Sequence, residues 1–400
     1  MQAMVAVTAL VLATVTGASA ESPGLEQVIA GSKPIVDLRL RSENVKQAGI
    51  AEEANAVTLR GRFGFETGKV WNTQLLAEAE LVWPLDSDYN STVNGKTQFP
   101  VVADPEDYAL NRLQLTNTSI AGTTLVVGRQ RMNIDDQRFV GASGWRQNEQ
   151  TFDAFRITNR SLHDLTFDLS YVGQVNRVYG ENSPVGRYQG STYFANAAYQ
   201  TPIGRLSAYL YVLDFDRAPT DSSQTAGLRF AGEHTFEGIK LAYSAAYATQ
   251  REYADSPLNY DDGYYALELA ATLHDFTLWA GTEVLEGDGV KGFATPLATL
   301  HKFQGWADKF LTTPANGIDD RYVTLGYAKK RLGPFDVFSV TASYHDFASE
   351  RLAIDYGSEF DAQLQLKRER FTLSLKYADY AADRFATDTR KFWVQLEYIR

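Results

Sequence analysis

Residues 57–66 have the sequence VTLRGRFGFE, in which every second residue is apolar or glycine and the residues between them are mostly polar. Neighbouring side chains of a β-strand point to opposite faces, so this period of two predicts a strand with one apolar and one charged face. Residues 35–41 and 74–83 repeat the alternation. Such segments approach the length of about 9–11 residues that a tilted membrane strand needs. The sequence therefore predicts membrane-spanning β-strands.

The connections between the alternating segments differ in length in a regular order. Short connections are expected at 68–69, 119–122, 160–164, 201–204, 235–238, 274–275, 332–334 and 368–370, and longer ones at 85–107, 132–150, 176–190, 216–224, 251–262, 286–319, 349–358 and 381–390. Short turns at one end and long loops at the other are typical of outer-membrane barrels, and the segments add up to about 18 strands, an even number. We therefore expect an all-β fold: a closed antiparallel transmembrane β-barrel in the bacterial outer membrane, with short periplasmic turns and long extracellular loops.

The first twenty residues carry no charge and end in Ala18-Ser19-Ala20. An apolar run followed by small residues predicts a secretory signal peptide over residues 1–20, although the usual positive charge near the start is missing. An N-terminal membrane helix is the alternative, but the apolar run is short for one. We expect residues 21–400 to form a single barrel domain.

The composition narrows the range of functions. The chain has no cysteine, which excludes a disulfide scaffold, a thiolate metal site and a catalytic thiol. A net charge of −11 argues against nucleic-acid binding, which needs a basic surface. The five histidines fall outside any HExxH motif, and no GxSxG motif or glycine-rich phosphate loop is present. We therefore expect no enzyme, no cofactor and no metal site, with a barrel-embedded lipase that uses a Ser-His pair as one alternative.

The residues 127–156, VGRQRMNIDDQRFVGASGWRQNEQTFDAFR, contain a long polar loop between two short alternating segments. We interpret this loop as folded inward, so that its charges line a pore. Guanidinium groups stay charged and meet carboxylates bidentately, and a ring of arginines selects anions. The candidates for substrate binding and selectivity are Arg60, Arg62, Arg112, Arg129, Arg131, Arg156 and also Arg39 on strands, with Arg138 and Arg146 on the loop. The phase near Arg129 is weak, and Gln130 is the alternative inward residue.

Acidic residues are expected on the same inward faces. Glu78, Glu80 and Asp153, together with Asp168, are candidate lumen partners of the arginines, and about half of the inward arginines are expected in such pairs. The remaining arginines would set selectivity. Three aromatic residues of the same region, Phe139, Trp145 and Tyr108, are candidates to stack on sugar rings.

A long apolar loop and two pairs of adjacent acidic residues are further features of the sequence. The loop 287–319 is too apolar for a free extracellular loop, because it contains Leu297, Trp306 and Phe310. It either constricts the channel or packs against a neighbouring loop, and packing is favoured. The acid pairs Asp261-Asp262 and Asp319-Asp320 contain the oxygen ligands that calcium prefers, but adjacent acids are usually solvated turn residues.

The final segment, residues 391–400, alternates apolar and polar residues and resembles the C-terminal strand that the outer-membrane assembly machinery reads. That pattern expects a terminal aromatic residue, whereas this chain ends in Arg400. The machinery, together with outer-membrane lipid, is therefore an expected partner.

Two long motifs, GRQRMNIDDQRFVGASGWRQNEQTFDA (128–154) and GFATPLATLHKFQGWADKFLTTPANGIDD (292–320), resemble the alginate-export family of outer-membrane porins. The resemblance implies a monomeric 18-stranded barrel whose arginine-lined lumen passes an anionic uronate polysaccharide or its oligomers. An export role would add periplasmic partners. The alternative is a general porin for small anionic or neutral solutes. Export and import are both compatible with the sequence.

Overall fold

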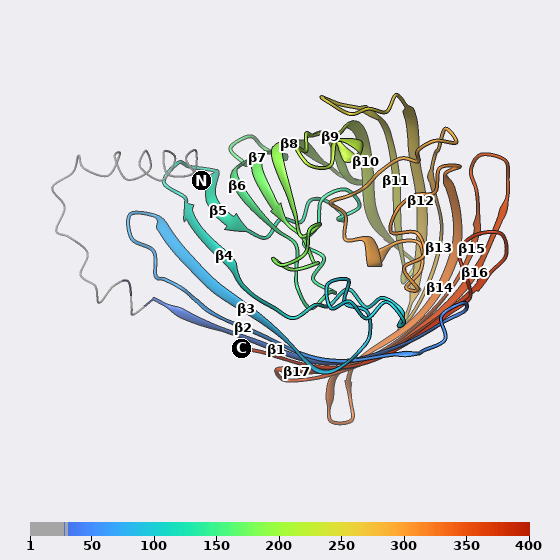
Figure 1. Ribbon diagram of the computed structural model, residues 1–400. Coiled ribbons are helices and arrows are strands. Elements are labelled where there is room, and N and C mark those ends of the chain that lie inside the picture. The colour runs from blue at the N-terminus through green and yellow to red at the C-terminus, as the bar shows by residue number, and fades with distance from the viewer. Residues whose placement is uncertain (1–27, 29–30) are drawn as a thin grey trace.

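The computed structural model describes Val28 and residues 31–400, and its strands form one closed 18-stranded antiparallel sheet. Closure is made by β1 (Lys33–Gln47), which pairs with β2 (Ala54–Glu66) on one side and with β18 (Thr389–Ile399) on the other. Figure 1 shows the strands around loops that enter the middle of the barrel. The predicted fold class is confirmed. The predicted signal peptide, residues 1–20, lies outside the described residues.

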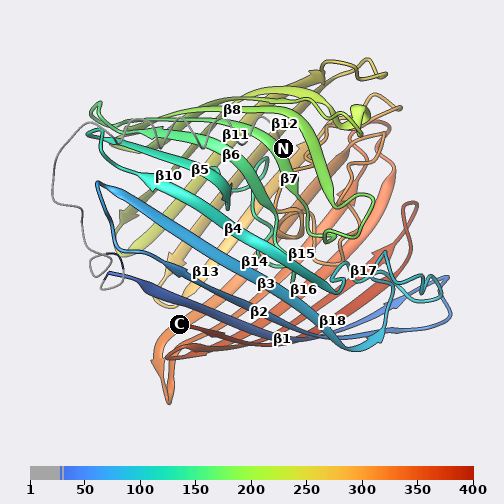
Figure 2. The ribbon, with the colours of Figure 1, turned by 60° about the vertical axis from the view of Figure 1, so that its left-hand side comes forward.

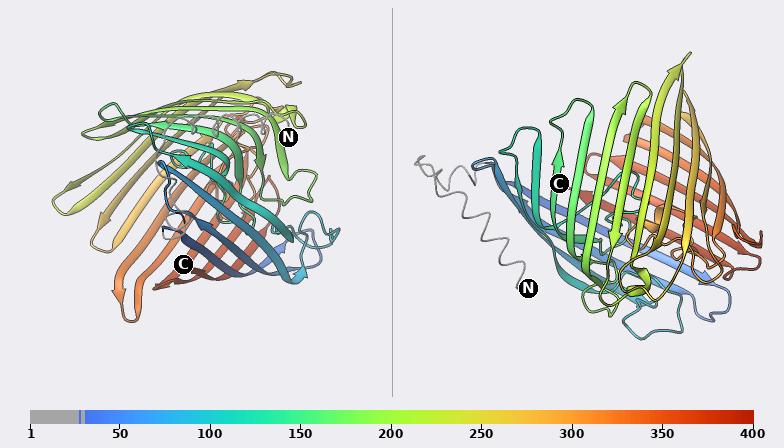
Figure 3. Two further views of the ribbon diagram at one scale, coloured as in Figure 1. Left: turned by 90° about the vertical axis from the view of Figure 1, so that its left-hand side faces the viewer. Right: turned by 90° about the horizontal axis from the view of Figure 1, so that it is seen from above.

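Between these strands every strand pairs with its neighbours in the chain, and all are tilted (Figure 2; Figure 3). Their bounds are β3 (Thr73–Asp88), β4 (Asp107–Asn117), β5 (Thr123–Gln130), β6 (Thr151–Asn159), β7 (Leu165–Asn176), β8 (Arg187–Thr201), β9 (Gly204–Leu213), β10 (Ser223–Phe236), β11 (Ile239–Glu252), β12 (Asp261–Leu273), β13 (Phe276–Leu285), β14 (Ile318–Leu332), β15 (Phe335–Ala348), β16 (Asp355–Arg368) and β17 (Phe371–Ala382). Two short 3-10 helices, η1 (Pro219–Asp221) and η2 (Leu300–Lys302), lie in loops. Across the described part of the chain, no helix is both long and apolar enough to cross a membrane.

The two ends of the barrel differ as the sequence predicts. One end, the turn end, carries short connections such as 202–203 and 333–334. The other end, the loop end, carries the long connections 89–106, 131–150 and 286–317. Short and long connections alternate because consecutive strands are antiparallel, and the even strand number places both chain ends of the sheet at the turn end.

Apolar side chains lie on the outer face of the strands and charged side chains on the inner face, which is the inverse of the distribution in a water-soluble protein. On β2 the apolar Phe63 is 47% exposed on the outer face, whereas Arg60 is 0% exposed on the inner face. Apolar residues outside and charged residues inside suit a wall that faces lipid, and closure leaves no strand edge unpaired in the hydrocarbon. A charged residue at one of the alternate strand positions that point inward therefore directs its side chain into the lumen.

The hydrophobic core lies inside the barrel, between the wall and the inward loops. Phe139 of the loop 131–150 has its ring centroid 5.3 Å from those of Tyr209 and Tyr264 on the wall. Phe293 of the loop 286–317 lies 6.0 Å from Phe139. These aromatic contacts bury the apolar surface of both loops, so the loops are part of the folded core and narrow the lumen.

Candidate functional site

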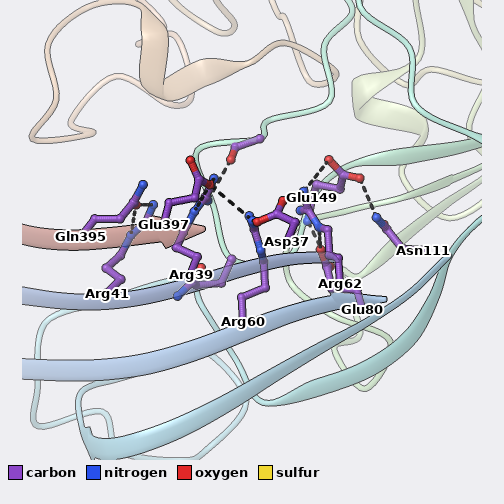
Figure 4. A network of polar contacts seen from close by, with 12 residues as sticks. Asp37, Arg39, Arg41, Arg60, Arg62, Glu80, Asn111, Glu149, Gln395 and Glu397 are labelled. Atoms are coloured by element: carbon purple, nitrogen blue, oxygen red, sulfur yellow. Dashed lines mark hydrogen bonds and ion pairs between the residues drawn. The ribbon is translucent and has the colours of Figure 1, made fainter. Parts of the chain in front are cut away.

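Four arginines stand on the inner face of β1 and β2, and we call Arg39, Arg41, Arg60 and Arg62 the arginine wall (Figure 4). The strand period of two places them there, and the register sets Arg39 directly opposite Arg60. Like charges that lie directly opposite destabilise a sheet unless acids separate them. The wall therefore depends on carboxylates from other strands and from the loops.

Glu397 of β18 supplies one of these carboxylates. Its Oε1 accepts a hydrogen bond from Arg39 Nη2 at 2.7 Å and lies 3.5 Å from Arg60 Nη2. Arg60 also pairs with Asp37. Arg60 Nε and Nη1 are buried and have no hydrogen-bond partner among the described residues. The carboxylate between the two guanidinium groups is available only because the barrel closes between β18 and β1.

Arg39 and Arg41 also hold the loop 131–150 against the wall. Arg39 Nη1 donates to the carbonyl oxygens of Gly144 and Trp145 at 3.0 and 3.1 Å. Arg41 donates to the Trp145 carbonyl as well, and its guanidinium lies 4.1 Å from the centroid of the Trp145 ring. These contacts cover the two arginines and turn them into anchors for the loop.

A second group of charges surrounds Glu149 of the same loop. Glu149 accepts hydrogen bonds from Arg131 at 2.8 and 2.6 Å and from Asn111 at 2.6 Å. Arg62, which pairs with Glu80, lies 3.4 Å from Glu149. Burial would raise the pKa of Glu149, but Arg62 and Arg131 outweigh burial and lower this pKa to about 2. Glu149 is therefore a fixed negative charge at physiological pH.

Two predicted arginines pair within the wall of the barrel. Arg112 of β4 binds Glu78 of β3 bidentately at 2.9 and 2.7 Å. Arg156 of β6 binds Asp168 of β7 with contacts of 2.9 and 2.7 Å. Both pairs face the lumen, and Glu78, Glu80 and Asp168 are the acidic partners expected there.

The inward assignment of Arg129 and Asp153 is wrong. The register sets Arg129 opposite Leu113, which is exposed on the outer face, and opposite Asp153, to which Arg129 donates at 2.7 and 3.0 Å. Gln130 is the buried, inward residue, and it donates to the Ala154 carbonyl. Two adjacent polar residues at the end of a short strand left the phase undecided in the sequence.

The loop arginines reach the lumen but serve as clamps. Arg138 donates to Glu283 of β13 at 2.7 Å and to Thr295 of the loop 286–317 at 3.0 Å. Arg146 donates to Asp308 at 2.7 Å. Burial would lower the pKa of Arg146, but Asp308 outweighs burial and raises it. Each clamp joins the loop 131–150 to a distant part of the chain.

The loops 131–150 and 286–317 bind each other inside the barrel, and we call them the inner loop pair. Gly141 N donates to Leu297 O at 2.9 Å, and Thr299 N donates to Gln137 O at 3.0 Å. A Cβ on Gly141 would stand 2.1 Å from Thr299 Oγ1, so the absence of a side chain at Gly141 leaves the space that the Thr299 side chain occupies. The loop 286–317 thus packs against a neighbouring loop, which is the favoured alternative, and because this packing lies inside the barrel the loop also narrows the lumen.

A buried charge cluster, absent from the sequence-based candidates, fastens this pair to β17. His301 Nδ1 lies 2.8 Å from Asp308 Oδ1, and His301 Nε2 lies 2.6 Å from Lys376 Nζ. Burial, together with Lys376, lowers the pKa of His301 well below its usual value. The neutral ring accepts from Lys376, donates to Asp308 and stacks on Trp145 at 4.6 Å. No sequence motif links these residues, because they are brought together only by the folded loops.

None of the three aromatic candidates for sugar stacking lies free in the lumen. Phe139 is packed among wall aromatics, and Trp145 is enclosed between Arg41 and His301. Tyr108 lies opposite Leu81 on the outer face, where it is exposed. The expectation for Tyr108 is wrong in phase, and the other two rings are occupied by the protein itself.

Exposure divides the inward arginines into two sets. The side chains of the arginine wall, Arg138 and Arg146 are at most 10% exposed. Arg112, Arg131, Arg156 and Arg229 are 15%, 33%, 21% and 22% exposed, and we call them the accessible arginines. Arg229 of β10 pairs with Asp136 at 3.0 Å and was missed in the sequence because it lies outside the arginine-rich stretch. Its signal was the alternation of Arg229 with Leu228 and Phe230.

A cavity of about 440 Å³ lies under the inner loop pair, against β10 to β15. Its lining includes Arg229, Glu268, Trp279, Glu283, Tyr322 and His345. Among the described residues, no group of three or more His, Cys, Asp or Glu could hold a metal ion. Of the two acid pairs considered for calcium, the second is engaged by the protein, since Asp319 pairs with Arg321 and Asp320 pairs with His345.

Comparisons with known proteins agree with this architecture. The family described as alginate export matches residues 37–261. Among solved structures, Pseudomonas aeruginosa OpdO has a TM-score of 0.73 at 16% identity, covering 94% of this chain and 98% of its own. Pseudomonas aeruginosa OccK9 (OpdG) has a TM-score of 0.74 at 16% identity, with coverage of 94% and 99%. Pseudomonas aeruginosa OpdK with vanillate has a TM-score of 0.71 at 13% identity, with coverage of 93% and 99%. No curated protein matches the chain.

Proposed function

The chain belongs to the alginate-export family of outer-membrane β-barrel porins, and from this premise we propose that its lumen conducts anionic saccharides, above all uronate-rich polymers or oligomers. The accessible arginines are the groups that meet the substrate. The buried arginines hold the inner loop pair in place against the wall of the barrel. This division gives the arginine-rich sequence two separate tasks.

The exposure of Arg112, Arg131, Arg156 and Arg229 carries the proposal. Each keeps part of its guanidinium group open while a carboxylate holds its position, as Glu149 holds Arg131. A uronate carboxylate has the same geometry as the carboxylates that pair with the accessible arginines. It can therefore replace one of them at an arginine for a short time. Several weak sites in series let a charged chain enter and leave again.

One observation favours a second candidate function, a general porin for small anionic or neutral solutes. Each of the nine predicted selectivity arginines has a carboxylate oxygen within 4.0 Å. Paired charges attract a mobile ion less than unpaired ones, because the field of each pair falls off quickly. In this alternative the arginines only shape the pore.

Planar-bilayer recording tests the proposal against its alternative. Under a salt gradient the proposal expects an anion-selective reversal potential and current block by oligouronates, with weaker block by neutral oligomers of equal length. A reversal potential without selectivity, and block that is indifferent to charge, would instead favour the general porin.

The proposal includes the cellular setting. Residues 1–20 serve as the signal peptide that secretion to the outer membrane requires, and the apolar outer face contacts outer-membrane lipid. We further propose that the barrel is monomeric and that the outer-membrane assembly machinery recognises β18. Transport outward would add a periplasmic partner at the turn end.

A further inference from the structure

Two aromatic rings lie flat against the inner face of the barrel, on β13 and β14. Tyr322 stands opposite Gly281, and its ring atoms Cζ and Oη lie 2.5 Å from the position of a Cβ on that glycine. Trp279 ring atoms Cζ3 and Cη2 lie 2.7 and 2.9 Å from the Cβ position of Gly326. A ring that fills the place of a missing Cβ lies along the backbone, so its other face is turned away from that strand.

Both rings border the cavity of about 440 Å³ under the inner loop pair. They differ in this from Phe347 and Phe310, which are buried in the core. Trp279, and the part of Tyr322 that the stacked His345 leaves uncovered, therefore present apolar ring surface to this cavity. Because Gly281 and Gly326 have no side chain, the two rings can lie directly against the strand backbone.

Polar groups stand at the edges of the rings. Tyr322 Oη donates to Glu268 Oε2 at 2.7 Å. His345 is stacked on Tyr322 with 5.2 Å between ring centroids, and its Nδ1 lies 2.9 Å from Asp320 Oδ1. Carboxylates beside a flat ring accept hydrogen bonds from hydroxyl groups, whereas they repel a ligand carboxylate.

This combination matches the chemistry of a pyranose ring. One face of such a ring carries C–H bonds whose weak positive charge is attracted by the negative face of an aromatic ring. The rim of the same sugar carries hydroxyl groups that can donate to Glu268, which lines the cavity. A uronate residue lying here would turn its carboxylate away from this acid, toward Arg229.

We propose that Trp279 and Tyr322 form a stacking site for the apolar faces of pyranose rings on the inner face of β13 and β14. The site rests on the proposed function for its saccharide substrate, but it recognises the sugar ring and not the charge. Neutral oligosaccharides therefore bind here too. The pathway then has two kinds of site, arginines for the carboxylates of the saccharide chain and aromatic rings for its sugar rings.

The test is current block in a planar bilayer by a neutral β-1,4-linked oligoglucoside. For Trp279→Ala and Tyr322→Ala we expect blocked-state dwell times about tenfold shorter than for the unaltered protein. The reversal potential should stay unchanged. Polyethylene glycol of equal length, a chain without rings, should give the same dwell time in all variants. Unchanged oligoglucoside dwell times, or equal shortening for polyethylene glycol, would overturn the stacking site.

Gly281→Ala provides a second variant in case an alanine in place of a ring disturbs assembly. Its Cβ meets the far end of Tyr322 at 2.5 Å and pushes the ring off the wall while keeping it in the protein. We expect the dwell time to fall here as well, with open-channel conductance retained. Trp71→Ala, in the exposed turn 67–72, is the matched control and should leave the dwell time unchanged.

The two proposals fail differently. Loss of anion selectivity with intact block by the neutral oligoglucoside would contradict the arginine pathway alone. Anion selectivity that persists while the ring variants leave neutral block unchanged would contradict the stacking site alone.

Discussion

Arg39 and Arg60 lie directly opposite each other on β1 and β2, and the Glu397 carboxylate stands between them, 2.7 Å from one guanidinium and 3.5 Å from the other. The first prediction follows from this arrangement. Glu397→Gln leaves two buried cations facing each other, so the free energy of unfolding should fall by up to about 3–5 kcal/mol. Urea unfolding of the barrel in lipid vesicles measures the change.

Glu53→Gln is the matched control for this substitution. Glu53 pairs with Lys46 at 2.8 Å, but both side chains are exposed. Removing a solvent-exposed pair should change stability by no more than about 1 kcal/mol. Equal effects of the two substitutions would show that Glu397 does not support the arginine wall.

The inner loop pair gives the second prediction. Gly141→Ala places a Cβ 2.1 Å from Thr299 Oγ1 and forces the two loops apart. We expect a larger open-channel conductance and more current noise in a planar bilayer, because the loops narrow the lumen. Gly144→Ala, three residues further along the same loop, meets nothing within 4 Å and should behave like the unaltered protein. Identical traces for both variants would mean that the contact does not position the loops.

The third prediction concerns pH and His301. Its pKa is lowered by burial and by Lys376, so the neutral ring is favoured when the loop 286–317 is docked. A released loop binds a proton more readily, so docking weakens as pH falls below the ordinary histidine pKa of about 6.5. Asp308 keeps its charge throughout, because its pKa is held well below its usual value against the effect of burial, chiefly by Lys391. Arg146 also faces this cluster and stays charged.

Gating events counted in bilayer recordings between pH 8 and pH 5 measure this effect. We expect them to become more frequent in the acidic part of this range and to lose their pH dependence in His301→Gln. His163→Gln, at a fully exposed histidine of the connection 160–164, should retain the dependence. A pH dependence that survives His301→Gln would assign it to another group.

Much of the barrel was predictable from alternation alone. The period of two correctly placed Arg60 and Arg62 on the inner face, because lipid-facing strands separate apolar and charged residues strictly. At Arg129 the same rule failed, since Gln130 beside it is also polar and β5 ends there. The phase could be settled only by the register with Leu113 on the neighbouring strand.

The division of the arginines could not be read from the sequence, because their exposure depends on contacts between distant segments. Arg41 is covered by Trp145, which belongs to a loop about a hundred residues further along the chain. Lys376 meets His301 only because the inner loop pair crosses the lumen to β17. Alternation predicts which face a residue occupies, whereas the fold of the loops decides whether a solute can reach it.

The central claim is that the accessible arginines meet the anionic substrate. The reversal potential of Arg131→Gln under a salt gradient tests this claim most directly. Arg131 is the most exposed of them, and Glu149 keeps Arg62 and Asn111 as partners after the substitution. We predict a shift toward cation permeability and weaker block by oligouronates. Arg321→Gln removes the same charge from the exposed outer face and should leave both unchanged. Equal behaviour of the two variants would contradict the claim.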